Sequence, residues 1–321
     1  MFKMSNKLYV SMYHYTRNIV NSRYPGIKGL SDVQFRSQIE YLNEKFNIVC
    51  MEQVLDSLMN KSLLPENALL LTFDDGYIDN YTCVFPVLNE LKLSGCFFIP
   101  AKTFSTHSLL DVNKIHYILA CANENELVND VMLQMDYYRG REFDYARTDD
   151  LYAAYAVGNR FDTKNTIFIK RMLQTVLPER LRNIISSNLF AKYVGITEEQ
   201  LAYELYMSED QIRTLKRNGM YIGIHGYDHY WLGDLPYEQM KKDIDMALEV
   251  MDEFIDKKRW AMNYPYGSYN RGVLNYIQGK GACVGFTTKV RVADIDTDSP
   301  LEIPRLDCND FPPVSMNYLK M

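Results

Sequence analysis

Hydrophobic and polar positions alternate along the first third of the chain in a repeating order, with short apolar runs followed by amphipathic stretches. The apolar runs have the length of buried strands, and they lie at residues 8–13, 46–50, 68–73 and 96–99. The stretches between them have apolar residues every three to four positions, which predicts helices after the Ser31–Gln34 capping box, over about residues 52–59 and up to Leu91. Strands that alternate with helices in this way form a parallel sheet with right-handed crossovers.

The middle of the chain has a different pattern. From about residue 111 to 207 it is charged, rich in Leu, Tyr and Met, and helix-periodic, with no convincing strand. The alternation then returns, with a helix over about 236–255 and apolar runs at 220–224, up to Tyr264, at 282–288 and at 301–306. We therefore expect an α/β barrel or open sheet in two parts, residues 1–110 and 208–321, interrupted by a helical insertion over 111–207.

Composition and charge exclude several classes of protein. The 321 residues include 35 Lys and Arg against 41 Asp and Glu, and a net charge of −6 argues against a nucleic-acid-binding protein or an anionic-membrane-binding protein. With 47% hydrophobic and 24% charged residues, the composition is that of a globular protein. No apolar run approaches the roughly 20 residues of a membrane span, and the first residues lack the apolar core of a secretory signal. The six cysteines form no CxxC pair. We expect a cytoplasmic protein.

Polar clusters follow four of the expected strands. They are His14, Asp74-Asp75-Gly76, His225-Gly-Tyr-Asp-His229 and Asn263-Tyr-Pro-Tyr-Gly267. Taken singly, an Asp-Asp-Gly turn or two histidines four positions apart are more often ordinary loop residues than a metal site. Taken together they predict an active site, because the carboxyl ends of parallel strands meet on one face of an α/β barrel.

The segment Thr72-Phe-Asp-Asp-Gly-Tyr77, together with the His225–His229 cluster and Tyr264-Pro-Tyr-Gly267, resembles the polysaccharide deacetylases of the NodB-homology group. These proteins, carbohydrate esterase family four, are metal-dependent N- or O-deacetylases with a distorted (β/α) barrel. The resemblance covers about residues 7–105 and 208–310, so it implies that fold for the chain and leaves the helical insertion unexplained.

The resemblance also implies roles for the residues at matching positions. Asp75, His225 and His229 would bind one divalent metal ion, with zinc as the first choice and manganese, iron, cobalt or nickel as alternatives. Asp74 would be the general base for a metal-bound water that attacks the amide carbonyl. The backbone N–H of Tyr266 would help to hold the oxyanion.

Two departures from the family pattern concern the general acid and an arginine. No histidine follows His229, so the usual late general acid is absent. The sequence is most similar to the circularly permuted poly-N-acetylglucosamine deacetylases of biofilms, whose acid histidine comes from a Tyr-His pair that Tyr13-His14 matches. We therefore predict that His14 protonates the leaving amine; the alternative is a histidine that only bonds nearby backbone.

The arginine that begins the third motif in many members is replaced by Asn263. Arg305 could take its place by pairing with Asp74, or it could form a plain surface ion pair. Asp228 lies between the two metal histidines and could support them, although a turn-forming role is the simpler interpretation. Tyrosines inside the motifs could meet a sugar at the barrel mouth. They are Tyr13, Tyr77, Tyr227, Tyr264 and Tyr266.

These observations predict a metal-dependent hydrolase that removes an acetyl group from an N-acetylated sugar in bacterial surface-glycan biosynthesis. A cytoplasmic location favours a nucleotide-linked, lipid-linked or oligosaccharide substrate over a finished polymer. The insertion could cap the barrel or form the interface of a homo-oligomer. Two alternatives stay open: a non-catalytic carbohydrate-binding protein with the same fold, and a deacetylase acting on an O-acetyl ester or another linear amide.

Overall fold

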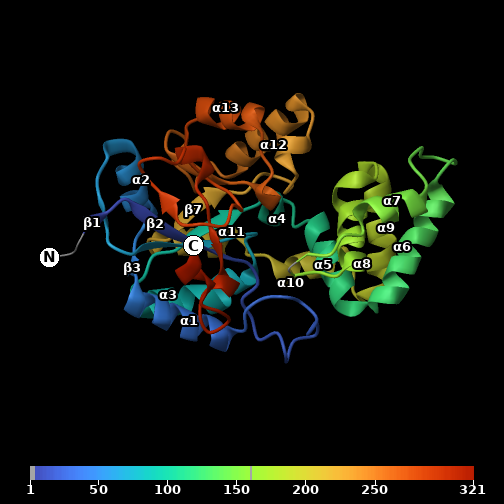
Figure 1. The fold of residues 1–321 in the computed structure, drawn as a ribbon, viewed down its shortest axis with the longest axis horizontal. Helices are drawn as coiled ribbons and strands as arrows, with labels where there is room; N and C mark the ends of the chain where they lie inside the picture. Colours follow the sequence, from blue (N-terminus) through green and yellow to red (C-terminus); the bar gives the residue numbers. More distant parts are fainter. Residues whose placement is uncertain (1–3, 160) are drawn as a thin grey trace. The chain divides into compact units, whose positions relative to one another are not determined.

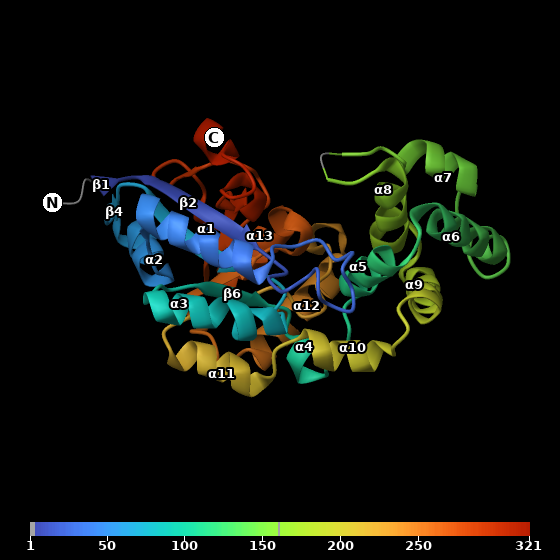
Figure 2. The same cartoon turned by 90° about the horizontal axis from the view of Figure 1, so that it is seen from below.

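The computed structural model of the chain describes residues 4–159 and 161–321, and contacts divide the chain into two compact units. The first unit comprises the residues up to Asn18 together with 29–107 and 204–321. The second comprises residues 19–28 and 108–203. Figures 1 and 2 show the sheet with its surrounding helices in the first unit and a group of helices in the second.

Within the described residues, the first unit contains a nine-stranded sheet. Its main path runs through β10 (Ala293–Asp294), β2 (Lys7–Tyr13), β5 (Ala68–Phe73), β6 (Cys96–Ile99), β7 (Tyr221–Ile224), β8 (Trp260–Asn263) and β9 (Ala282–Phe286). Two short strands lie off this path, β3 (Asn47–Ile48) beside β5 and β11 (Leu306–Asp307) beside β2. All pairs are parallel except β10 with β2. A separate antiparallel pair joins β1 (Met4–Ser5) to β4 (Leu64–Pro65).

The segment from Ile303 to Asp307 joins the two ends of the parallel part of the sheet. Ile303 forms a parallel bridge with Phe286 at the end of β9, and Leu306 in β11 pairs with Ser11 in β2. The sheet therefore curls round as a distorted barrel. The continuous strand expected over 301–306 is wrong: residues 300–302 form the 3-10 helix η5, and only β11 is a strand. Pro304 explains the interruption, because proline has no N–H to donate to a neighbouring strand.

Helices lie along the outside of this sheet (Figures 1 and 2). They are α1 (Asp32–Lys45), α2 (Met51–Asn60), the π-helix η1 (Asn80–Val84), α3 (Phe85–Leu91), α4 (Lys102–Ser105), α11 (Glu209–Arg217), α12 (Tyr237–Val250) and α13 (Arg271–Gly279). Short 3-10 helices lie in the connections, at η3 (Leu232–Asp234), η4 (Pro265–Gly267), η6 (Cys308–Asp310) and η7 (Asn317–Lys320). The helix starts at Ser31 and Ser208 have the reciprocal hydrogen bonds of a capping box, with Gln34 and Gln211.

The helix expected over 236–255 is shorter in the structure, because α12 ends at Val250 and a turn follows. Met251 and Phe254 in this turn are buried in the core, which explains why the apolar pattern continues past the end of the helix.

Both faces of the parallel sheet are covered, as its continuous apolar runs require. In β5 every residue is buried, and successive side chains enter different clusters. Leu69 and Leu71 belong to one buried cluster with residues of α1, α3 and α12, whereas Leu70 belongs to another with residues of α2 and with Phe286 of β9. The strand thus has no solvent-facing side, and its carboxyl end is a rigid support for the residues that follow it.

The second unit is helical. Its elements are α5 (Asp111–Cys121), α6 (Glu124–Tyr138), α7 (Thr148–Tyr155), α8 (Lys164–Arg171), the π-helix η2 (Met172–Val176), α9 (Glu179–Tyr193) and α10 (Glu198–Leu205), which continues to the unit boundary. Residues 19–28 cluster here because the ring of Tyr24 packs edge-on against Tyr117 of α5, with 4.8 Å between ring centroids. Among the described helices, none combines the length and the hydropathy that crossing a bilayer would require.

Candidate active site

The turn after β5 presents two adjacent carboxylates. The backbone N–H of Asp74 donates to the carbonyl oxygen of Tyr13 at 2.9 Å, which continues the pairing of β5 with β2 by one residue. Asp75 and Gly76 then have φ values of 71° and 66°. The left-handed region is costly for a residue with a side chain, so the surrounding structure must hold Asp75 in this conformation. The turn sends the two carboxylates to different neighbours.

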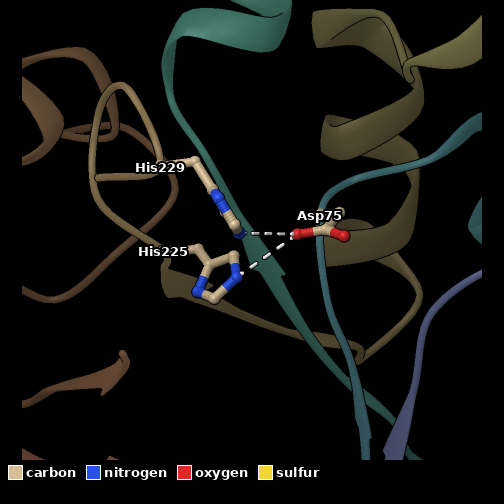
Figure 3. A group of neighbouring side chains, drawn as sticks. All are labelled: Asp75, His225 and His229. Carbon is tan, nitrogen blue, oxygen red and sulfur yellow. Dashed lines mark ion pairs between the residues drawn. The ribbon is translucent and has the colours of Figure 1, made fainter. Parts of the chain in front are cut away.

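Asp75 faces two imidazoles that follow β7. Its Oδ1 lies 3.3 Å from Nε2 of His225 and 3.2 Å from Nε2 of His229 (Figure 3). All three side chains are buried, and one potential ligand atom from each lies within 4.8 Å of the others. The structure therefore brings together the three residues for which the sequence predicted a common site.

Hydrogen bonds orient two of these three side chains. Tyr77 donates from its hydroxyl to Oδ2 of Asp75 at 2.7 Å, which leaves Oδ1 to face the imidazoles. Nδ1 of His225 lies 2.7 Å from the carbonyl oxygen of Asn263, so Nδ1 carries the proton and Nε2 presents its lone pair to the site. Nδ1 of His229 has no hydrogen-bond partner among the described residues.

Protonation states favour cation binding at this triad. Burial acts to raise the pKa of Asp75, but the contacts with His225 and His229 outweigh it and hold the pKa well below its usual range. Burial lowers the pKa of His229, against the opposing effect of Asp75. A charged carboxylate and a neutral imidazole are the forms that bind a metal ion. Oδ1 of Asp75 is buried with no hydrogen bond from the residues that the structure describes. Oδ1 of Asp75 and the two Nε2 atoms form a set of one oxygen and two nitrogen donors, which fits a divalent ion such as zinc.

Asp74 is held by a different set of groups. Its Oδ1 accepts hydrogen bonds from Nη1 of Arg305 at 3.0 Å and from Nδ2 of Asn263 at 2.5 Å. Its Oδ2 lies 3.7 Å from Nε2 of His14. Burial acts to raise the pKa of Asp74, but the charge of Arg305 and the neighbouring His14 and His225 hold that pKa below its usual value. One oxygen of this carboxylate is therefore fixed by donors, and the other remains a proton acceptor.

Arg305 is a buried part of the site. Only 2% of the residue is exposed, which excludes the surface ion pair. Besides Asp74, its guanidinium donates to the carbonyl oxygen of Thr287 at 3.1 Å and to the hydroxyl of Thr72 at 3.1 Å. It also donates to Oδ1 of Asn263 at 3.0 Å. Asn263 and Arg305 thus hold Asp74 together, a role that the sequence did not predict for Asn263.

His14 and Tyr266 border the same site. The side chain of His14 is 41% exposed, whereas the metal-site triad, Asp74 and Arg305 are all buried. Tyr266 has a left-handed backbone, with φ 58° and ψ 6°. Its half-buried ring stacks on Trp231 with 4.4 Å between centroids and packs edge-on against His229 at 4.7 Å. Trp231 had not been singled out from the sequence.

One expectation about neighbouring residues is wrong, and one alternative is decided. Tyr13, Tyr77 and Tyr264 are buried and cannot meet a sugar. Their hydroxyls donate instead to Gln38, Asp75 and the carbonyl oxygen of Leu301. Of the two roles open to Asp228, support of the histidines is not the one observed: its carboxylate pairs with Lys102, while Nδ1 of His225 faces the carbonyl oxygen of Asn263.

Comparisons with known proteins support this fold. The polysaccharide deacetylase family model matches residues 142–284, a range that contains His225, His229 and Tyr266 but not the two aspartates. The putative polysaccharide deacetylase YxkH of Bacillus subtilis (strain 168) is 23% identical over 154 residues, which are 48% of this chain and 46% of that protein. The chain thus matches about half the length of this curated relative.

Solved structures share the fold over nearly the whole chain. The Streptococcus pyogenes deacetylase PplD, in complex with acetate, is 15% identical with a TM-score of 0.58, covering 98% of this chain and 96% of that one. IcaB from Ammonifex degensii is 19% identical with a TM-score of 0.57, covering 99% and 97%. A de-N-acetylase from Aggregatibacter actinomycetemcomitans is 16% identical with a TM-score of 0.57, covering 98% of each chain.

Together these findings confirm the resemblance to the NodB-type polysaccharide deacetylases and the distorted barrel that it implied. The fold is like that of IcaB.

Proposed function

We propose that the chain is a divalent-metal-dependent deacetylase that hydrolyses the acetamide of an N-acetylated sugar. The observation that supports this most directly is the pair of adjacent carboxylates after β5. Asp75 faces the two imidazoles, while Asp74 is held by Arg305 and keeps a free oxygen. The match to the polysaccharide deacetylase family supports the same class of reaction.

Asp75, His225 and His229 would hold the metal ion. When bound, a divalent cation polarises a carbonyl oxygen and lowers the pKa of a water molecule in its coordination shell. Zinc suits the one-oxygen, two-nitrogen donor set, and manganese, iron, cobalt and nickel are the alternatives.

The remaining groups of the site would handle protons. Arg305 and Asn263 occupy Oδ1 of Asp74, so a proton removed from the attacking water would go to Oδ2. His14 lies 3.7 Å from this oxygen and is partly exposed, where it would give a proton to the amine nitrogen as the C–N bond breaks. The N–H of Tyr266 would donate to the carbonyl oxygen as negative charge develops there. The products are acetate and the free amino sugar.

The substrate belongs, in this proposal, to surface-glycan biosynthesis in the cytoplasm, as a nucleotide-linked, lipid-linked or oligosaccharide N-acetyl sugar. The helical unit would cap the barrel or form a homo-oligomer interface. The polysaccharide deacetylase match over residues 142–284 supports a carbohydrate substrate.

The test is acetate release from a panel of N-acetylated sugars, O-acetylated sugars and simple acetyl esters, with and without a chelator. We expect release from an N-acetylated sugar that the chelator abolishes and added zinc restores. Release only from O-acetylated substrates would shift the assignment to an esterase. Sugar binding without any release would favour the non-catalytic alternative.

A further inference from the structure

The loop between the two histidines, residues 226–228, is held by backbone hydrogen bonds on one side. The N–H of Ala101 donates to the carbonyl oxygen of Gly226, and the N–H of Lys102 donates to that of Tyr227, both at 3.1 Å. These two donors follow β6, so the loop is fixed to the neighbouring strand of the barrel.

Two backbone N–H groups of this loop donate to a single side chain from α12. Asp243 accepts the N–H of Tyr227 at Oδ2, 3.0 Å away, and the N–H of Asp228 at Oδ1, 2.9 Å away. The two carboxylate oxygens thus bind two successive N–H groups, midway between His225 and His229. When the carboxylate is ionised, these two bonds are stronger than hydrogen bonds between neutral groups.

Asp243 lies on the buried face of α12, where its neighbours are apolar. It is buried on the same face of α12 as Met240, Ile244 and Ala247. Burying a carboxylate is unfavourable unless its oxygens are hydrogen-bonded, and the loop N–H groups provide those bonds. A charged residue on the buried face of a helix is the sequence signal that could have identified this position.

The loop is also shaped to approach this carboxylate closely. Gly226 has φ 71°, and a Cβ at this position would lie only 2.9 Å from Oδ2 of Asp243. His229, at the other end, also has a positive φ of 59°. A loop with such conformations at both ends needs external support to keep a single shape.

We propose that Asp243 is a positioning residue for the metal site. By holding the N–H groups of Tyr227 and Asp228, it keeps the two imidazoles directed at Asp75 and thereby sets the affinity for the divalent ion. This inference rests on the proposed function only in taking His225 and His229 as metal ligands. The ion pair between Lys102 and Asp228 is partly exposed and contributes less.

The decisive variant is Asp243→Asn, which keeps the shape of the side chain but turns one oxygen into an N–H₂ group that faces a backbone N–H. Its matched control is Asp245→Asn on the same helix, because Asp245 pairs at the surface with Tyr276 and Lys280. Both variants are stripped of metal, and the dissociation constant for Zn²⁺ is measured by competition with a chromophoric chelator. The absorption spectrum of bound Co²⁺ reports the ligand geometry.

We expect the Zn²⁺ dissociation constant of Asp243→Asn to rise about 10- to 100-fold and its Co²⁺ spectrum to change. Asp245→Asn should match the wild type in both. Circular dichroism identifies the folded fraction, and Asp243→Ser, which retains a small acceptor, replaces Asp243→Asn if the latter does not fold. A folded Asp243 variant with unchanged affinity and spectrum would overturn the inference.

This outcome differs from failure of the proposed function, because metal binding is measured without substrate. Wild-type protein that binds Zn²⁺ but releases no acetate would contradict the proposed activity and leave the role of Asp243 standing. Wild-type protein that binds no Zn²⁺ would overturn both.

Discussion

Arg305 donates from Nη1 to Oδ1 of Asp74 at 3.0 Å, and both side chains are buried. The two residues come from segments far apart in sequence, the turn after β5 and the segment that joins β9 to β2. Asp74 is therefore a buried carboxylate with one oxygen fixed by donors and the other free. In this chain the arginine that pairs with the general base of the proposed reaction therefore reaches the site through the closing segment of the barrel.

Replacing Arg305 with methionine should impair both folding and catalysis. The buried carboxylate of Asp74 would lose its main cationic partner, and removing one member of a buried pair typically lowers the free energy of unfolding by about 3–5 kcal/mol. Urea unfolding measures this loss. Burial would then raise the pKa of Asp74, so the acidic limb of the pH–rate profile should move to higher pH. An unchanged acidic limb in folded protein would contradict the proposed base.

Tyr77→Phe should weaken metal binding with little effect on packing. The variant keeps the ring, which stacks on Tyr15 with 4.1 Å between centroids, but removes the hydroxyl that donates to Oδ2 of Asp75. Loss of such a supporting hydrogen bond typically costs about 10- to 100-fold in metal affinity, measured by chelator competition. Tyr81→Phe is the control, since this ring lies against Phe85 and not at the site. Equal affinity in both variants would refute the role of Tyr77.

His14→Ala should lower the rate with an amide substrate by about 10²–10⁴-fold, the usual contribution of general acid–base catalysis. The partly exposed side chain contributes little packing, so the free energy of unfolding and the Zn²⁺ affinity should change little. An acetyl ester with a good leaving group needs no proton donor, and its hydrolysis should be much less affected. Equal losses for both substrates would exclude His14 as the general acid.

The free energy of unfolding of the metal-free protein should depend on pH because Asp243 titrates. Burial raises its pKa to about 6, whereas in the unfolded chain it returns to about 3.9. Between these values the folded state binds more protons than the unfolded state, so stability falls as pH rises. Because the slope reaches its limit of about 1.4 kcal/mol per pH unit only midway between the two pKa values, the wild type should lose about 2 kcal/mol relative to Asp243→Asn between pH 4 and pH 6. Parallel unfolding curves for the two proteins would contradict this prediction.

Local sequence patterns were sufficient to predict the strands and turns that carry the site. The apolar run of β5, followed at once by Asp74 and Asp75, needs no long-range information, and the same holds for β7 and His225. Residues whose role depends on distant partners were harder to predict. Periodicity could not reveal that Asp243 of α12 supports the loop 226–228. Nor could it reveal that Asn263 forms hydrogen bonds with both Asp74 and Arg305.

Errors in the sequence interpretation have physical causes. Tyr13, Tyr77 and Tyr264 carry both a large ring and a hydroxyl, and the sequence does not show that buried acceptors satisfy those hydroxyls. The association of residues 19–28 with the helical unit depends on a close approach, in which a Cβ on Gly26 would lie 2.4 Å from the carbonyl oxygen of Ala120. No spacing along the chain shows that contact.

The central claim is that Asp75 binds the metal ion while the adjacent Asp74 acts as the base. It is tested most directly by measuring bound metal and acetate release from an N-acetylated sugar in the same preparations of wild type, Asp74→Asn and Asp75→Ala. The account predicts that the wild type holds one ion and loses activity with chelator. Asp74→Asn should keep the ion but lose at least about 10²-fold in rate, and Asp75→Ala should lose both. Acetate release that survives in Asp75→Ala, or that persists in the wild type after complete metal removal, would contradict it.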